Sequence, residues 1–264
     1  MKSVVEIIET GFSCGATGYT FSTHPTNLTI VNALRDSGKI ETGFGLYPVL
    51  PYAQEYVRLA NEKGMRGVVD ETLSKLSFSG KAKALFKGGL SALRLDPHGI
   101  LKAYVDMELA GYLSEKPESI PLRSVLLHEV VTDLCLGLRD VDLLDAFAQH
   151  IREKYHVSPG FVTYNLVTFV ELFRKAGLTI EGVIIMTPFN SIGYQMSPSR
   201  QSCETCLSSL PESIIAMSIM AGGYLTVERS LDYLRTLPRL SGVAAGVSSK
   251  EHAEFTFKKL RSSL

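Results

Sequence analysis

The sequence predicts a single-domain α/β fold, the (β/α)8 TIM barrel, from the spacing of its apolar runs and from the segments between them. Eight short apolar runs recur along the 264 residues at about the spacing of one βα unit, and each ends in a polar or glycine-bearing turn. The intervening segments have the three- and four-residue apolar spacing of amphipathic helices. Eight parallel strands that alternate with helices close into a barrel. The predicted strands cover residues 18–22, 44–49, 92–95, 125–127, 161–164, 183–187, 214–218 and 243–247.

Start and stop signals place the helices of the first half. The first helix after a strand stops at Gly38, and the next begins at Pro51, because proline is favoured at the first helical position. Extra helical segments at 68–76 and 81–86 precede the third strand, and we interpret them as an insertion. The helices expected after the first three strands cover residues 26–36, a segment from Pro51 to Gly64, and residues 100–113.

The second half follows the same alternation. After the fourth strand, apolar residues at helical spacing from Leu144 to Tyr155 predict a face that packs on the barrel. The sixth strand is almost entirely apolar, as is typical of a parallel strand that is covered on both faces. Helices are expected over 166–176 and 226–237, and Ser248-Ser-Lys-Glu251 is a capping box that starts the last helix.

The composition limits the classes of protein to which the chain can belong. The chain is 45% hydrophobic and 20% charged, which is ordinary for a globular domain, and 264 residues can bury one large core. The formal net charge is +0 and no run of Lys or Arg occurs, so nucleic acid is not an expected partner. No stretch approaches the roughly 20 apolar residues of a membrane span. The four cysteines are scattered, which favours reduced thiols and a cytoplasmic protein. We expect a small molecule as its ligand, and the sequence does not predict an oligomeric state.

Three histidines fall at predicted strand ends, namely His24, His98 and His128. In a barrel these positions face one mouth, so residues distant in sequence can meet there. Together with Asp96 they are nitrogen and oxygen ligands of the kind that hold Zn²⁺ or another divalent ion. The alternative is that each imidazole hydrogen-bonds a loop carbonyl. His128 also suits general acid–base catalysis, whereas Glu129 is expected on the opposite face of the strand.

Two further loops carry candidate ligand-binding groups. The segments after the seventh and eighth strands contain glycines and hydroxyls where barrels often bind phosphate, and the alternative is plain turn and capping chemistry. The candidates are Gly222, Gly223, Ser248, Ser249 and Lys250. The long loop after the sixth strand offers Asn190, Tyr194 and Gln195, which either contact a substrate together with His98 or order the loop.

From the fourth strand onward the order of motifs resembles that of the aldo-keto reductases, over roughly residues 125–257. Leu126-Leu-His128 resembles the strand-end histidine of that family, and Gly160-Phe-Val-Thr-Tyr-Asn165 is similar to the region that holds the nicotinamide amide. The segments at 215–223 and 246–252 resemble its two phosphate-side loops. The resemblance implies an aldo-keto-reductase-like barrel with NADP(H) as cofactor, bound by Asn165 and the serines Ser248 and Ser249.

The first half departs from the family pattern. The family has Asp and Tyr after the first barrel strand and Lys after the second, whereas here the first strand ends Ser22-Thr-His24 and the second contains Tyr47-Pro48. The catalytic candidates are therefore His128, Tyr47 and His24. Thr256 stands where the family has an Asn that contacts adenine.

Three hypotheses follow. The first is a small-molecule enzyme, an oxidoreductase that binds NADP(H) or another phosphate-bearing ligand. The second is a metal-dependent hydrolase, isomerase or lyase that uses His24, Asp96, His98 and His128. The third is a non-catalytic ligand-binding barrel.

Overall fold

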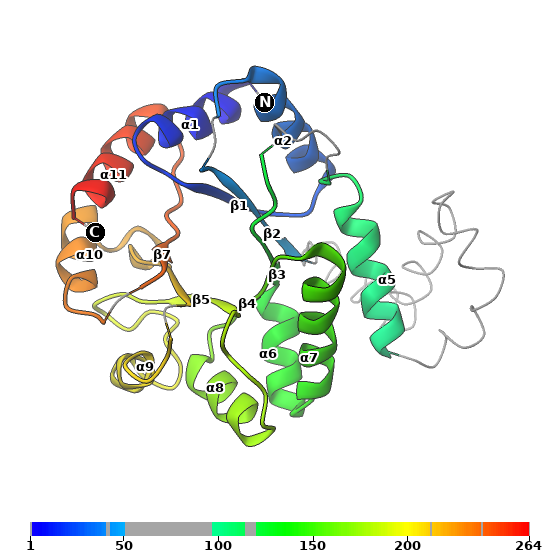
Figure 1. Cartoon of the computed structure of the whole chain (residues 1–264). Helices are drawn as coiled ribbons and strands as arrows, with labels where there is room; N and C mark the ends of the chain where they lie inside the picture. The colour runs from blue at the N-terminus through cyan, green and yellow to red at the C-terminus, as the bar shows by residue number, and fades with distance from the viewer. Residues whose placement is uncertain are drawn as a thin grey trace, which may run out of the picture.

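The computed structural model describes residues 2–40, 43–50, 97–113, 120–211, 213–238 and 240–263. Within these ranges seven strands form one sheet in chain order, and every neighbouring pair is parallel. Figure 1 shows the sheet curled around the centre of the molecule with helices outside it, which is the predicted α/β barrel architecture. The strands are β1 (Gly18–Ser22), β2 (Gly45–Leu50), β3 (Ser124–Leu127), β4 (Ser158–Val162), β5 (Ile184–Pro188), β6 (Ile214–Met217) and β7 (Gly242–Val243).

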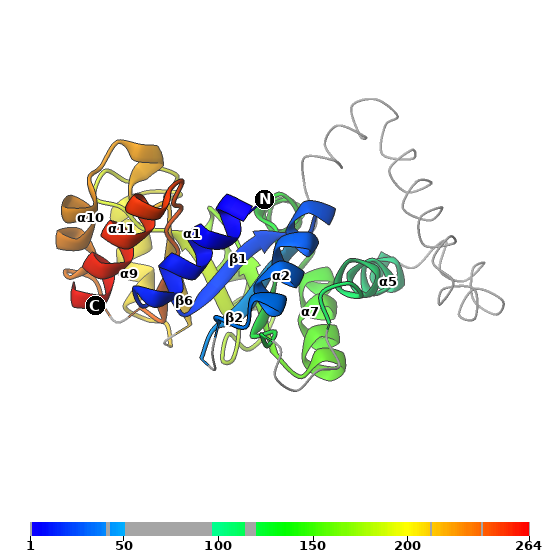
Figure 2. The ribbon, with the colours of Figure 1, turned by 90° about the horizontal axis from the view of Figure 1, so that it is seen from above.

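The helices form the outer layer, as Figure 2 shows from a second direction. They are α1 (Lys2–Ser13), α2 (Pro25–Ser37), α5 (Pro97–Leu109), α6 (Glu129–Leu138), α7 (Val141–His150), α8 (Leu166–Lys175), α9 (Arg200–Leu207), α10 (Val227–Leu234) and α11 (Lys250–Ser263). A π-helical turn, η1 (Ile151–Tyr155), continues α7, and a 3-10 turn, η2 (Ala221–Gly223), follows β6. None of the helices in the described ranges has the length and apolar character to span a membrane.

The first and last helices lie side by side (Figures 1 and 2). A Cβ on Gly11 of α1 would come within 3.1 Å of the Phe257 ring on α11, so the absent side chain permits this close approach. Lys250 of α11 also forms an ion pair with Glu6 of α1. The two ends of the chain thus close the outer layer between β7 and β1.

The sequence predicts one further strand between β2 and β3. The run 92–95 lies outside the described residues, but β2 pairs directly with β3, as Val49 with Leu126 and Leu50 with Leu127. The His128 backbone N–H donates to the Leu50 carbonyl at 2.5 Å, which occupies the edge of β2. The prediction of a strand between these two is therefore wrong. An apolar run indicates that a segment is buried, but it does not specify which strands pair edge to edge.

Three boundaries also differ from the sequence prediction. The run 161–164 belongs to a strand that starts earlier, at Ser158, and ends at Val162, because Ser158 and Pro159 pair with the start of β3. The last strand stops after Val243. The last helix is capped by Ser249 and not by Ser248, since the Ser249 hydroxyl accepts from the His252 backbone N–H at 3.1 Å.

Side chains fill both sides of the curled sheet. Outside it, the rings of Phe147, Phe161, Phe169 and Phe173 pack together under α7 and α8, with centroids 4.1–5.8 Å apart. Next along β4, Val162 points the other way and forms an inner cluster with Leu126 and Met186. This alternation follows from the two-residue period of a strand.

Phe161→Ala removes the ring at the centre of the outer cluster. We expect a loss of about 3–5 kcal/mol in the free energy of unfolding, because a fully buried aromatic leaves a cavity. For a domain of this size the Tm falls by roughly 10 °C. Urea and thermal unfolding measure both quantities. The matched control is Phe255→Ala, since Phe255 is 48% exposed; equal losses in the two variants would contradict the assignment of the core.

Candidate functional site

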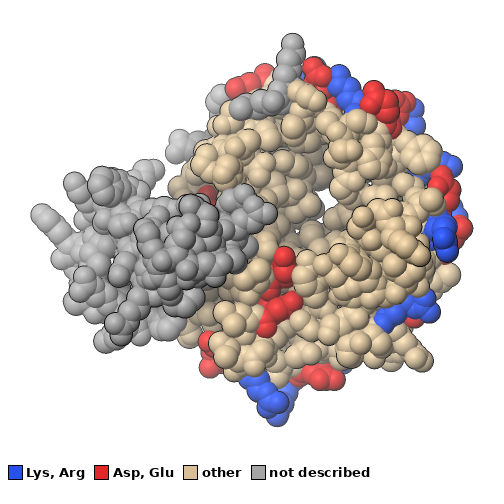
Figure 3. Space-filling view, turned by 180° about the vertical axis from the view of Figure 1, so that it is seen from behind, with Lys and Arg blue, Asp and Glu red and all other residues tan. Residues whose placement is uncertain are grey.

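The carboxyl ends of all seven strands meet at one face, because every pairing is parallel. In Figure 1 the labelled strands, β1 to β5 and β7, follow one another clockwise in the sheet order β1 to β7, so with right-handed crossovers the view is onto their amino ends. Figure 3, from behind, therefore shows the carboxyl ends. Acidic side chains lie near the centre of that face beside a hollow, whereas the Lys and Arg visible in this view lie at its periphery.

Polar side chains from four strand ends form a continuous chain of contacts across this face, which we call the polar chain. Its members are His128 after β3, Glu129 at the start of α6, Tyr164 after β4, Gln195 in the β5–α9 loop and Ser218 after β6. His128 and Glu129 are 3.0 Å apart, and Glu129 and Tyr164 are hydrogen-bonded. Tyr164 also bonds Gln195, whose Oε1 accepts from the Ser218 hydroxyl at 3.3 Å.

His128 has two alternative partners for the same ring nitrogen. Its Nδ1 accepts a hydrogen bond from the Val130 backbone N–H at 3.3 Å, which makes His128 the N-cap of α6. This bond requires that Nδ1 carries no proton. The same Nδ1 faces Glu129 Oε2 at 3.0 Å, and that contact requires a proton on Nδ1. The two bonds exclude each other, because one needs a bare Nδ1 and the other needs a proton on Nδ1.

Two carboxylates one helical turn apart on α6 have pKa values displaced in opposite directions. Burial acts to raise the pKa of Glu129, but the hydrogen bond and charge of His128, its own backbone N–H and the Tyr164 hydroxyl together hold that pKa below its usual value. Burial raises the pKa of Asp133 above its usual value, and the charge of Glu129 adds to this. Such separation is typical of carboxylates with different roles in one site.

Asp133 joins the first turn after β4 to α6. Its Oδ1 accepts from the Thr163 hydroxyl and its Oδ2 from the Tyr164 backbone N–H at 3.1 Å. The Asn165 side chain also bonds Asp133. These hydrogen bonds lower the pKa of Asp133 by less than burial raises it. They also fix the backbone that carries Tyr164.

Tyr164 keeps its proton at neutral pH. Burial raises its pKa, the nearby charges of Glu129 and Asp133 raise it further, and only the hydrogen bond from Gln195 acts in the other direction. The phenol is therefore a hydrogen-bond donor that orients Glu129. Among the described residues it is a tyrosine held by carboxylates and an amide, not by a lysine.

Asp133 and Tyr164 were not among the candidates predicted from sequence, and Glu129 was considered but separated from His128. Glu129 was placed on the face opposite His128, which is wrong because β3 ends at Leu127 and the alternation of a strand no longer applies at Glu129. The i, i+4 spacing of Glu129 and Asp133 was visible in the sequence and was the available signal.

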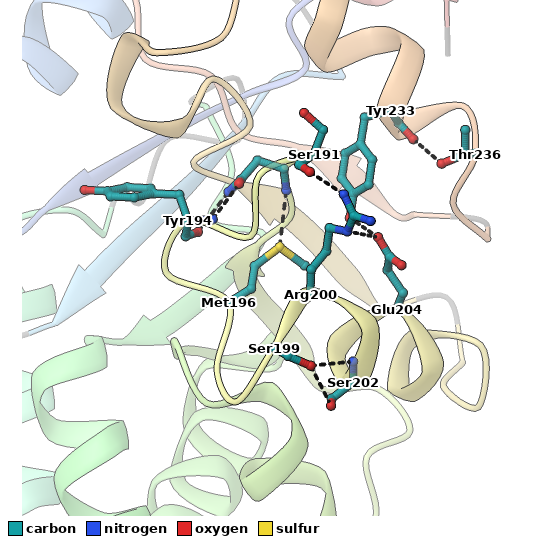
Figure 4. A network of polar contacts seen from close by, with 10 residues as sticks. Ser191, Tyr194, Met196, Ser199, Arg200, Ser202, Glu204, Tyr233 and Thr236 are labelled. Carbon is teal, nitrogen blue, oxygen red and sulfur yellow. Dashed lines mark hydrogen bonds and ion pairs between the residues drawn. The ribbon is translucent and has the colours of Figure 1, made fainter.

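The β5–α9 loop is ordered by its own side chains (Figure 4). Fully buried Asn190 accepts from the Tyr194 backbone N–H at 2.7 Å and donates to the Tyr194 and Ser218 carbonyls at 2.9 and 3.3 Å. Arg200 holds the Ser191 carbonyl and lies 3.3 Å from Glu204, which also accepts from the Tyr233 hydroxyl at 2.8 Å. Of the substrate candidates in this loop, Gln195 thus lies in the polar chain and Asn190 is occupied by loop bonds.

The remaining candidates from the first half lie apart from the polar chain. His24 is the N-cap of α2, since its Nδ1 accepts from the Thr26 backbone N–H at 3.2 Å. Tyr47 lies in the inner cluster with its ring over Gly18, where a Cβ would be 2.5 Å from the ring. His98 is half-buried in the first turn of α5, and Asp96 lies outside the described residues. Across the described ranges no group of three or more His, Cys, Asp and Glu side chains is placed to hold a metal ion.

The glycine turn after β6 is open. Ala221, Gly222 and Gly223 all have positive φ, and nothing lies within 4 Å of where a Cβ on Gly223 would be. At the start of α11, the Ser249 hydroxyl caps the helix and Lys250 pairs with Glu6 of α1. The Ser248 hydroxyl has no hydrogen bond to any part of the chain that the structure describes. Thr256 is fully buried in α11, so it does not face a ligand.

The opposite displacements of the two pKa values predict opposite pH trends in stability. The pKa of Glu129 is lowered in the folded state, so its stabilising contribution is present above the unfolded value of about 4.3 and is lost as pH falls. The cost of Glu129→Gln in urea unfolding should therefore be largest near neutral pH and shrink on acidification.

The raised pKa of Asp133 has the reverse sign. Its contribution is present below the unfolded value of about 3.9 and is lost as pH rises. Asp133→Asn, the matched control on the same helix, should thus gain stability relative to the wild type as pH rises. Parallel pH trends in the two variants would contradict this description of the site.

Comparison with known proteins supports the fold. No protein-family model and no curated protein matches the sequence. Among solved structures, the chain is similar to the crystal structure of an aldo-keto reductase enzyme from a Medee basin deep-sea metagenome library, with a TM-score of 0.51 and 10% sequence identity. The match covers 98% of this chain and 85% of that chain. The chain therefore has an aldo-keto-reductase-like α/β barrel fold.

Proposed function

We propose that the protein is a small-molecule oxidoreductase that uses NADP(H) to interconvert a carbonyl compound and an alcohol at the carboxyl ends of its strands. The observation that carries the proposal is the His128–Glu129 pair, 3.0 Å apart and extended by Tyr164, at the end of the barrel where this fold places its chemistry. An imidazole held by an ionised carboxylate is suited to proton transfer at neutral pH.

His128, Glu129 and Tyr164 each have a separate role in the proposed reaction. In the reducing direction, His128 carries protons on both ring nitrogens, its Nδ1–H bonds Glu129, and its Nε2–H is given to the carbonyl oxygen. Glu129 stays ionised and compensates the imidazolium charge. Tyr164 donates to Glu129 and fixes its orientation. A bound NADPH would supply the hydride.

His128 replaces the proton donor of the resembling family. That family uses a tyrosine whose hydroxyl is tuned by a lysine, and here Tyr47 packs in the inner cluster over Gly18. Glu129 has no counterpart in the resemblance, and it gives His128 the charged partner that an acid needs. The donor role thus moves from the end of the first strand to the end of β3.

The turn after β6 fits a phosphate-bearing cofactor in part. Gly222 and Gly223 leave the backbone open to a phosphate oxygen, and Ser248 offers an uncommitted hydroxyl. Lys250 would have to exchange Glu6 for the phosphate. Asn165 bonds Asp133, so only the part of its amide that this bond leaves open would reach a nicotinamide.

The other two hypotheses have less support. The metal-dependent alternative requires ligands that converge, and His24 and His128 each cap a separate helix. A non-catalytic barrel would bind the cofactor without turnover, and the contact between His128 and Glu129 would then have no catalytic role.

The test is His128→Asn, because asparagine is as good an N-cap as any residue but cannot act as an acid. NADPH should protect both wild type and variant, and at 100 times its Kd it adds about 2.7 kcal/mol, roughly 5–10 °C in Tm. NADPH consumption with a panel of aldehydes and ketones should fall by about 10²–10⁴ in kcat/KM in the variant only.

Two further variants make the result specific. His128→Ala should lose the same activity and in addition about 1 kcal/mol of stability from the cap. His24→Asn replaces the other N-capping histidine and should retain activity. No protection at millimolar NADPH or NADH, or full activity in His128→Asn, would overturn the proposal.

A further inference from the structure

A pocket lies at the opposite end of the barrel from the polar chain. It is an open pocket of about 530 Å³ at the amino ends of three strands, where Arg123 precedes β3, Ser158 begins β4 and Gly182 precedes β5. This volume is typical of small-molecule sites. Arg152 and His156 complete its basic lining, and among the residues that the structure describes no acidic side chain lines it. Because the whole chain has a formal net charge of +0, this local excess of positive charge is a feature of the pocket.

Arg152 is an incompletely satisfied cation. Its Nη2 is buried and has no hydrogen-bond partner within the described part of the chain. A buried guanidinium N–H without an acceptor is costly, and native structures usually satisfy it with a protein group or a ligand. For an anion in the pocket to supply the missing acceptor, the guanidinium must turn toward the pocket that Arg152 lines.

The turn that carries Arg152 is held rigidly from its other side. Asp106 of α5 accepts from the Tyr155 hydroxyl at 2.6 Å, lies 2.8 Å from His150 Nε2 and pairs with Lys154 at 2.5 Å. These three bonds clamp the π-helical turn η1, and such turns occur frequently at functional sites. Arg152 lies in the same turn but takes no part in the clamp, so it remains available to the pocket.

Arg123 is positioned by a glycine. A Cβ on Gly45 of β2 would lie 2.2 Å from Arg123 Cγ, so the arginine stem occupies the space that any other residue would fill. The Arg123 backbone N–H also donates to the Leu46 carbonyl at 3.0 Å. The stem is thus fixed before any ligand arrives, which lowers the entropy that binding must overcome.

We propose that this pocket binds a small molecule through a phosphate group, with Arg152 and Arg123 as the guanidinium donors and His156 at the rim. Two arginines match the planar, bidentate recognition of phosphate oxygens. The site is separate from the carboxyl-end site, so its occupant acts on the protein from the other face of the barrel. Inorganic phosphate and a phosphate monoester share this chemistry.

The experiment measures binding of inorganic phosphate and of phenyl phosphate to the full chain by calorimetry and thermal shift, with sodium chloride at equal ionic strength as reference. Phosphate should raise the Tm above that reference. Arg152→Gln should weaken binding at least about tenfold, because a charge-assisted hydrogen bond is lost. Tighter binding of phenyl phosphate would identify an organic phosphate as occupant, and equal binding would identify free phosphate; both support the proposal.

Matched variants distinguish this pocket from a general charge effect and from the carboxyl-end site. Arg229→Gln removes the same charge from an exposed position on α10 and should leave binding unchanged. Lys250→Gln alters the carboxyl-end site and should leave the part of the phosphate binding that depends on Arg152 unchanged. Loss of phosphate binding in Lys250→Gln but not in Arg152→Gln would overturn the proposal. A lower Tm of unliganded Arg152→Gln with wild-type phosphate affinity, or tighter binding of acetate than of phosphate, would overturn it as well.

Discussion

The parallel register of β3 on β4 is the constraint on which the candidate site depends. Leu127 pairs with Phe161, so the residues that follow each strand, His128 and Glu129 on one side and Thr163 and Tyr164 on the other, emerge side by side. They emerge partly buried, and a buried polar group needs a partner. Glu129 therefore bonds Tyr164, and Asp133 bonds the Thr163 hydroxyl and the Tyr164 backbone. The polar chain results from these hydrogen bonds between polar groups at neighbouring strand ends.

Much of the barrel could be predicted from sequence because parallel, doubly covered strands are short apolar runs, and helix caps mark the connections. The direct pairing of β2 with β3 could not be predicted, because the hydrogen bonds between two strand edges leave no pattern in the sequence of either strand. At the site, His128 was visible as a polar residue at a strand end. Glu129 was assigned to the wrong face because the strand ends one residue before His128, and Asp133 acquires its role only when β4 lies beside α6.

The two ends of the barrel differ in charge although the chain as a whole is balanced. At the carboxyl ends Glu129 contacts His128, and Asp133 lies one turn further along α6. At the amino ends Arg123 and Arg152 line a pocket that has no acidic lining among the described residues. Both regions involve β3 and β4, and α7 with its π-helical end connects the α6 layer to the arginine pocket. A ligand at the amino ends would thus contact the same strands that position the polar chain.

The central claim is that His128 and an ionised Glu129 act as one unit. Carboxyl-carbon NMR titration of Glu129 in the wild type and in His128→Asn tests it most directly. The pKa of Glu129 should lie below its ordinary value of about 4.3 in the wild type and rise in the variant, because the largest opposing contribution to burial is removed. An unchanged pKa in His128→Asn, or a wild-type pKa above the ordinary value, would contradict the account.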